Sequence, residues 1–264
     1  MRRRSWIGLV LISPFAILMV APFLYMVLRS FVDASGTPRW SDANYTAAFN
    51  ALPFSRFLVN SLVLAGGVAV AQVLTSATAA YAFARLRFPG RDRVFFAFLA
   101  MLIMPAVVLL VPRFLMVDAA GWVDSYAGLL STELVSVWGI FFLRQYFLTL
   151  PRDLEDAARL DGAGEWTIFW RVMLPLAKPG LVTLGLLAFV NQWKSFLWPL
   201  VATRSLDMRV MEVGLARFHG GGLYWSNEPV QMAAAVMTTL PLLIVFVVAQ
   251  RYIIRELPLG APRS

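Results

Sequence analysis

The sequence contains no cysteine and only one histidine, His219, and 14% of its 264 residues are charged. Without cysteine the chain cannot form disulfides, thiolate nucleophiles or cysteine-ligated zinc and iron–sulfur centres. One histidine is too few for a histidine-rich metal centre, so we expect no metal site. The low charge is also unusual, because soluble domains contain about 25% charged residues.

Hydrophobic residues are abundant instead, at 59% of the chain, and the formal net charge is +8. Soluble domains are roughly 45–50% apolar, so this is the composition of a membrane protein. A basic chain can bind nucleic acid or anionic lipid, or can have cationic residues flanking inserted helices. The high apolar content favours the last interpretation, with the lipid bilayer as partner and no nucleic acid.

Six apolar segments are each long enough to cross a bilayer, which requires about 20 residues of helix. They are residues 6–28, 57–83, 94–116, 126–147, 180–202 and 229–251. The fourth contains Glu133, and prolines within several segments are expected to kink the helices. The pattern predicts an all-α, polytopic membrane protein with six transmembrane helices, forming one transmembrane domain over residues 1–264.

The distribution of lysine and arginine predicts the orientation of these spans. With the N-terminus in the cytoplasm, fifteen of these residues fall on the cytoplasmic side and seven outside. Both termini are therefore expected to be cytoplasmic, with a cytoplasmic loop at residues 149–178 and a periplasmic loop at 203–228. The basic start of the chain could also indicate a secretory signal. Its apolar run is too long for one, so we expect a retained first helix.

The cytoplasmic loop 149–178, called here the coupling loop, has the pattern of two short helices around a glycine turn. Asp153 is placed to act as an N-cap, with Asp156 three residues later in the capping-box position. Gly162 and Gly164 supply the turn, where a left-handed residue is expected. The first short helix offers small alanines and acidic side chains for docking, although a solvated connector would show similar capping.

Within the coupling loop the order Glu155, Ala157-Ala158, Asp161-Gly162-Ala163 and Leu174-Pro175 resembles the EAA loop of permease subunits of ATP-binding-cassette (ABC) importers. Other stretches are similar to the shorter, second permease of the maltose-type carbohydrate branch. They are Pro105 with Pro112, Gly121–Gly128, Phe142–Phe147, Phe196–Leu200 and Ala249–Tyr252. The resemblance covers nearly the whole chain, although the tail Arg255–Ser264 departs from the family pattern.

The resemblance implies a bacterial cytoplasmic (inner) membrane location and a division of labour among subunits. This chain and a second permease would form the translocation path, an ATPase dimer would bind ATP and Mg, and an extracytoplasmic solute-binding protein would deliver the cargo. The residues implied to couple the permease to the ATPase are Glu155, Asp156, Ala157, Ala158, Asp161, Gly162, Leu174 and Pro175. The chain has no phosphate-binding loop, so we expect that it is not the ATPase itself. The resemblance implies a transport subunit that is not an enzyme and holds no cofactor.

The fifth span contains a polar and aromatic cluster that is a candidate for contact with the substrate. It consists of Asn191, Gln192, Trp193, Lys194, Ser195 and Phe196. Polar groups inside a bilayer are costly, which makes them functional candidates, and aromatic rings can pack on sugar faces. A polar seam between helices, or a lysine extending to the interface, explains the same residues equally well.

The periplasmic loop contains a second candidate site, Arg217, Phe218, His219, Gly220, Gly221 and Gly222. The resemblance implies that this loop contacts the binding protein, whereas the three glycines alone also suit an ordinary flexible connector.

Several functions remain open on the sequence. The importer could carry a carbohydrate, or glycerol phosphate, an amino sugar or another solute, and Lys194 would suit an anionic cargo. From other classes, a self-contained secondary transporter would need ionisable groups at broken helices, for which Glu133 and Lys194 are candidates. A membrane enzyme would have to use Glu155, Asp156 and Asp161, but no other acid–base or metal group accompanies them.

Overall fold

The computed structural model describes residues 2–33, 37, 40–218 and 227–254, and within these ranges it contains helices and no strand. The six longest or most central elements are α1 (Arg2–Ser30), α3 (Phe54–Arg85), α4 (Arg91–Ala100), α7 (Val137–Thr149), α11 (Lys178–Trp193) and α14 (Glu228–Ile254). Shorter helices join them: α2 (Ala43–Ala51), η1 (Met101–Ile103), α5 (Leu110–Ala119), α6 (Tyr126–Ser131), α8 (Asp153–Leu160), α9 (Glu165–Ile168), η2 (Phe169–Met173), α10 (Leu174–Leu176), α12 (Leu197–Ala202), η3 (Leu206–Met208), α13 (Met211–Leu215) and η4 (Ala216–Phe218). The predicted all-α fold is confirmed for the described residues.

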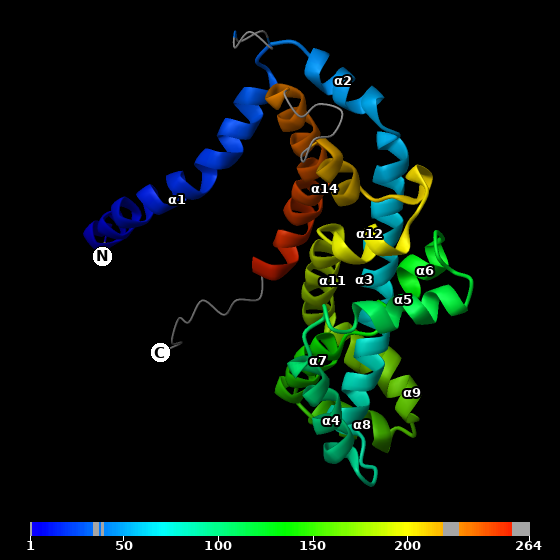
Figure 1. Ribbon diagram of the computed structural model, residues 1–264. Coiled ribbons are helices and arrows are strands. Elements are labelled where there is room, and N and C mark those ends of the chain that lie inside the picture. The colour runs from blue at the N-terminus through cyan, green and yellow to red at the C-terminus, as the bar shows by residue number, and fades with distance from the viewer. Residues whose placement is uncertain (1, 34–36, 38–39, 219–226, 255–264) are drawn as a thin grey trace.

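Helix α3 forms the central axis of the molecule, with α7 and α11 packed along it (Figure 1). Gly139 of α7 lets the three helices approach closely, because a Cβ there would lie 2.6 Å from Ser76 Oγ of α3 and 3.1 Å from Leu184 Cδ1 of α11. The 32 residues of α3 extend over about 48 Å at 1.5 Å per residue, more than the roughly 30 Å of a bilayer core. One end of α3 therefore reaches the level of α8 and α9, and the other reaches α2 and α13.

Helix α1 diverges from the rest of the molecule (Figure 1) and meets it near the start of α14. There Arg29 Nη2 lies 2.5 Å from Glu228 Oε2, and the Tyr25 hydroxyl donates to Glu228 Oε1 at 2.8 Å. Apart from half-buried Met26, all side chains of residues 13–28 are exposed. An apolar helix with so little packing in its own chain must be covered by lipid or by another subunit.

Three of the predicted spans are not single helices. Kinks at prolines were expected, but in these three segments the helix is interrupted, so the prediction of one helix for each segment was wrong. The segment 94–116 is interrupted between η1 and α5, the segment 126–147 between α6 and α7, and the segment 180–202 between α11 and α12. Pro105 and Pro199 each lack an N–H, and a proline ring clashes with the carbonyl four residues before it. In the middle segment Ser136 starts a new helix, because its side chain accepts a hydrogen bond from the Gly139 N–H.

Within the part of the chain that the structure describes, three uninterrupted helices are long and apolar enough to cross a membrane: Ser13–Ser30, Phe54–Arg85 and Glu228–Gln250. A fourth candidate is the pair Glu165–Leu176 and Lys178–Trp193, which is bent by 76°. Pro179 has no N–H to donate to the Pro175 carbonyl, which explains why one straight helix cannot continue through this point. The count of six spans remains a prediction, which requires interrupted helices to form the remaining spans.

Candidate functional site

The coupling loop folds as two short helices joined by a tight turn, as the sequence predicts. Gly162 forms the turn with φ +83°, a left-handed conformation that glycine adopts without steric cost. The predicted N-cap was wrong, because Asp153 is the first residue of α8, Arg152 takes the cap position, and no side chain caps the helix. Asp153, Glu155 and Asp156 all lie in the first turn, where their charges suit the positive end of the helix dipole.

Glu155 points into the protein and forms an ion pair with Arg85 in the last turn of α3. Arg85 Nε lies 3.0 Å from Glu155 Oε1, and both side chains are only 2% exposed. The Nε–H does not have hydrogen-bond geometry toward this oxygen, so the contact is electrostatic. The other end of the guanidinium donates from Nη2 to the carbonyls of Phe147 and Leu150, at 2.5 and 2.7 Å. Arg85 thus connects α3, the end of α7 and α8.

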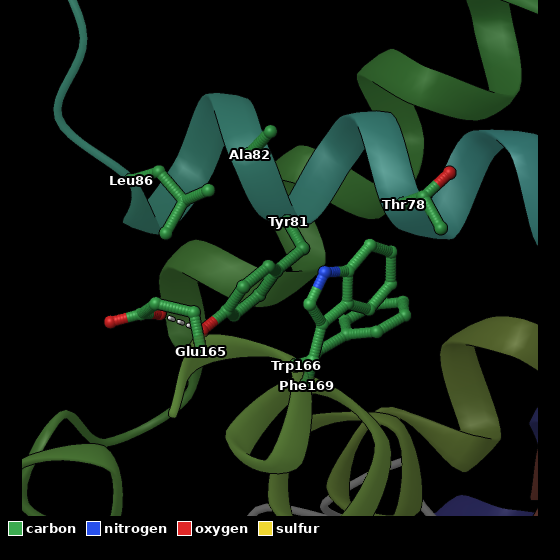
Figure 2. A pocket seen from close by; sticks show the side chains of 7 residues that line it. All are labelled: Thr78, Tyr81, Ala82, Leu86, Glu165, Trp166 and Phe169. Carbon is green, nitrogen blue, oxygen red and sulfur yellow. Dashed lines mark hydrogen bonds between the residues drawn. The ribbon is translucent and has the colours of Figure 1, made fainter. Parts of the chain in front are cut away.

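A second polar connection joins α3 to α9 (Figure 2). The Tyr81 hydroxyl donates to Glu165 Oε2 at 2.8 Å, and Arg159 of α8 donates from Nε to Glu165 Oε1 at 3.0 Å. Figure 2 shows Trp166 and Phe169 beside Tyr81, lining a pocket of about 210 Å³ with the C-terminal end of α3. The turn and both short helices are therefore held against α3 by side chains that lie far apart in the sequence.

The opposite side of α8 is exposed. Asp156, Ala157 and Asp161 are exposed, and Leu160 is 90% exposed, whereas Ala158 is half-buried. Arg159 Nη1 donates to Asp156 Oδ1 at 3.0 Å, which orients that carboxylate along the helix. The predicted coupling residues thus divide between an inner side that holds α8 in place and an outer side open to another protein.

The end of the coupling loop contains an irregular turn before the next long helix. Residues Phe169–Met173 form a π-helical turn, in which the Leu174 N–H bonds to the Phe169 carbonyl. Leu174 is half-buried in the cluster formed with Phe169 and Met173, and Pro175 is exposed. Leu174 and Pro175 therefore lie at the bend between the coupling loop and α11, and not on α8.

The candidate substrate cluster surrounds the break between α11 and α12. Asn191, Lys194 and Phe196 are exposed and Ser195 is half-buried. Gln192 and Trp193 are buried at 5% and 2%, and Trp193 donates from its indole N–H to the Thr238 carbonyl at 3.2 Å. In this conformation only part of the cluster is accessible, and Trp193 contributes to packing between α11 and α14.

The candidate loop for the binding protein is described only in part. Arg217 is exposed, whereas Phe218 is buried at 1% and anchors η4 in the core beside Phe57. His219, Gly220, Gly221 and Gly222 lie outside the described residues.

Two polar groups outside these predictions organise the end of the molecule opposite α8. Asn60 donates from Nδ2 to the carbonyls of Asp207 and Arg209, at 2.7 and 2.8 Å. Asp124 Oδ1 accepts from the backbone N–H groups of Arg204 and Ser205, at 2.9 and 3.0 Å. Burial raises the pKa of the Asp124 carboxyl, but these hydrogen bonds outweigh it and bring the pKa below its ordinary value.

An ion pair also joins two of the interrupted segments. Arg113 in α5 pairs with Glu133, and its guanidinium lies 4.3 Å from the ring centroid of Trp198 in α12. Opposite charges in two neighbouring apolar segments were the signal in the sequence from which this contact could have been predicted. Among the described residues no group of three or more His, Cys, Asp or Glu side chains could hold a metal ion.

Comparison with known proteins identifies the family. Residues 72–257 match the model of the binding-protein-dependent transport system inner membrane component. The chain is 33% identical to the arabinooligosaccharides transport permease AraQ of Halalkalibacterium halodurans, over 98% of this chain and 97% of that protein. It is 30% identical to the diacetylchitobiose uptake permease NgcG of Streptomyces coelicolor (99% and 90%), and 34% identical to the sn-glycerol-3-phosphate permease UgpE of Yersinia pestis (79% and 74%).

Solved structures agree with this assignment. A chain of a bacterial ABC transporter involved in importing the acidic polysaccharide alginate is 26% identical and superposes with a TM-score of 0.80, covering 95% of this chain and 96% of that chain. A second alginate transporter structure, in complex with an alginate-bound periplasmic protein, has the same fold at 16% identity, with a TM-score of 0.71 and 98% of both chains covered. The predicted resemblance to importer permeases is confirmed. By sequence and by fold, the chain belongs to the family of binding-protein-dependent transport system inner membrane components.

Proposed function

We propose that this chain is one of two permease subunits of an ABC importer for a carbohydrate, and that partner ATPases drive it through the coupling loop. The observation that supports this proposal most directly is the arrangement of α8. Its inner side is fixed to α3 through the buried pair Arg85–Glu155, and its outer side is exposed. A short helix held in this way can transmit force from a docked protein to the membrane helices.

The outer side of α8 has the chemistry expected of a protein-docking surface. Leu160, at 90% exposure, supplies an apolar anchor, Asp156 supplies a charge, and Ala157 leaves room for close approach. The ATPase dimer that docks there would bind the ATP and Mg, so this chain needs no cofactor of its own. Gly162 sets the angle of the turn behind this surface, and Leu174 and Pro175 lie at the bend toward α11.

The carbohydrate cargo is inferred from the relatives, because two of them are permeases for oligosaccharides. The likeness to the glycerol-3-phosphate permease keeps an anionic solute as a second candidate. Lys194 favours this candidate, since its exposed side chain lies at the break between α11 and α12, where a cation could meet a phosphate or a carboxylate. Asn191, Ser195 and Phe196 are the other accessible members of the proposed path.

The proposed partners account for the surfaces that the chain leaves uncovered. A second permease and the lipid of the bacterial inner membrane would cover α1 and the apolar break near Ile103, which is 83% exposed. The solute-binding protein would dock at the opposite end from α8, near Arg217 and the residues 219–222 that follow. We place both termini in the cytoplasm, in keeping with the charge distribution and with the junction of α1 and α14 at the far end.

The test is co-purification of the complex from the native membrane through a tag on this chain. The variants Leu160→Glu and Asp156→Lys change exposed side chains, so they should fold normally and reduce recovery of the ATPase at least tenfold. The matched control Leu206→Glu alters an exposed leucine of η3, at the other end of the molecule, and should retain the ATPase. Recovery of no ATPase with the unsubstituted chain would contradict the proposal and favour a self-contained transporter or a membrane enzyme.

The cargo is tested separately with the binding protein recovered in the same preparation. Its affinity for neutral oligosaccharides is compared with that for glycerol phosphate and acidic oligosaccharides. Tight binding of a neutral oligosaccharide supports the carbohydrate proposal. Binding of the anions alone contradicts it, and the variant Lys194→Gln should then reduce their uptake.

A further inference from the structure

Two side chains in the last turns of α3 hold the coupling loop through separate contacts. Tyr81 and Arg85 are four residues apart, so they lie on the same side of the helix. Tyr81 donates its hydroxyl hydrogen to Glu165 of α9, and Arg85 pairs with Glu155 of α8. Both side chains are buried, so neither residue takes part in the exposed docking surface of the coupling loop.

Arg159 joins these two contacts into one network. Its guanidinium donates from Nε to Glu165 Oε1 at 3.0 Å and from Nη2 to Glu155 Oε2 at 3.4 Å. Five side chains from three helices therefore form a chain of four contacts, whose two ends are joined through α3. We call this set the coupling ring: Tyr81, Arg85, Glu155, Arg159 and Glu165.

The charges of the coupling ring favour movement of α8 together with the end of α3 over movement of α8 alone. It contains two arginines and two glutamates, and the pair Arg85–Glu155 is almost fully buried. Separation of a buried pair leaves an uncompensated charge in a medium of low dielectric, which is strongly unfavourable. Movement of α8 relative to the end of α3 would therefore break the pair, whereas movement of the two helices together preserves it. The ring favours the second kind of movement.

The surrounding contacts give this movement a route into the membrane. Arg85 also donates to the carbonyls of Phe147 and Leu150 at the end of α7, and Tyr81 packs against Phe147 and Phe169. Helices α7 and α11 in turn pack along α3. Displacement of α8 would thus reach three membrane helices through α3 and the end of α7.

We propose that Tyr81 and Arg85 are positioning residues that transmit the displacement of α8 to α3 through the coupling ring. They contact neither solute nor ATPase, and they set how much transport each ATP hydrolysis event produces. This inference rests on the proposed function, because it requires an ATPase docked on the outer side of α8. A purely structural role would lower the amount of assembled complex without changing this ratio.

The experiment measures ATP hydrolysis and solute uptake in the same vesicles reconstituted with the complete importer complex. The first variant is Tyr81→Phe, which removes one hydroxyl and preserves the packing of the aromatic side chain. The others are Arg85→Gln, Arg85→Lys and Glu155→Gln. Tyr45→Phe is the matched tyrosine control, because its hydroxyl bonds to Ser30 at the opposite end of the molecule. Arg93→Gln is the arginine control, since Arg93 is exposed near the start of α4.

We expect Arg85→Gln and Glu155→Gln to reduce solute transported per ATP about tenfold with the ATPase still bound, and Tyr81→Phe to reduce it about threefold. Arg85→Lys should recover part of the loss, and the double variant Arg85→Gln/Glu155→Gln should be no worse than either single variant. An unchanged ratio in Tyr81→Phe and Arg85→Gln, or a fall in uptake that only follows loss of the ATPase, would overturn the inference. Failure of the unsubstituted chain to recover an ATPase overturns the proposed function instead, and this inference with it.

Discussion

Gly162 and Gly164 are two residues apart in the coupling loop but differ in backbone conformation. Gly162 has φ +83°, whereas Gly164 has φ −74° and lies in the extended region open to any residue. A Cβ atom at either position would have no neighbour within 4 Å. A comparison of the two positions therefore isolates backbone strain from packing.

We expect Gly162→Ala to destabilise the turn by about 1–2 kcal/mol, the cost of a left-handed conformation for a residue with a Cβ. Gly164→Ala should have little effect. Thermal unfolding of the detergent-purified protein measures both variants. Equal melting temperatures for the two would show that the strain at Gly162 is absorbed elsewhere in the turn.

Asp124 combines a positive φ of 61° with the hydrogen bonds that hold residues 204 and 205. Asp124→Ala should cost about 2–3 kcal/mol, because alanine is strained at this φ and leaves the two N–H groups unpaired. Asp124→Asn should cost less, since asparagine tolerates this conformation and retains an acceptor oxygen. Melting temperatures of the two variants provide the comparison.

The pKa of Asp124 adds a dependence on pH. Because the folded state holds this pKa below its ordinary value, the carboxylate stabilises the fold at neutral pH, and this contribution is lost as the pH falls through the folded-state pKa. The stability difference between the unsubstituted chain and Asp124→Asn should therefore shrink as the pH is lowered below about 4, the ordinary value for aspartate. A constant difference across that range would show that the charge contributes nothing.

At the scale of elements, the contact of α3, α7 and α11 depends on Gly139. A Cβ at this position would lie 2.6 Å from Ser76 Oγ and 3.1 Å from Leu184 Cδ1. Gly139→Val should therefore separate the helices and cost about 1–3 kcal/mol, which lowers the yield of folded protein in the membrane. Gly185→Ala is the control, because its Cβ would be in ordinary contact with Val73 at 3.4 Å. Equal yields for both variants would contradict this account of the packing.

The sequence was informative wherever a structural element depends on nearby residues. The two short helices and the Gly162 turn were predicted because turn signals act over a few residues. Kinks at prolines were predicted, but the full interruption of three apolar segments was not. Hydropathy measures length and polarity, but it does not show where a proline or a serine N-cap ends the hydrogen-bond pattern.

In the candidate site, too, the sequence indicated local features but not contacts between distant residues. The pattern of the coupling loop identified Glu155 as important but placed it at a docking surface, whereas the structure buries it against Arg85. Arg85 precedes Glu155 by seventy positions, and no local pattern connects two residues so far apart. Trp193 was selected for its chemistry, and only the packing of α11 against α14 shows that it is buried.

At the scale of the whole molecule, the absence of cysteine allows its topology to be tested cleanly. Single-cysteine variants Arg152→Cys and Ser41→Cys place one exposed thiol before α8 and another before α2. In intact cells, a membrane-impermeant maleimide should label Ser41→Cys and leave Arg152→Cys unlabelled until the membrane is opened. The reverse pattern would invert the proposed orientation of the chain.

The π-helical turn Phe169–Met173 also affects how the chain tolerates changes in length. A π-helical turn holds one residue more than the corresponding α-helical turn. Loss of a single residue there would convert it to ordinary α-helix with the flanking segments still facing their present neighbours. The same loss in the middle of α3 would rotate half of that helix by about 100° and turn its buried side chains outward. Natural single-residue deletions in this family should therefore be accepted at this turn and excluded from α3.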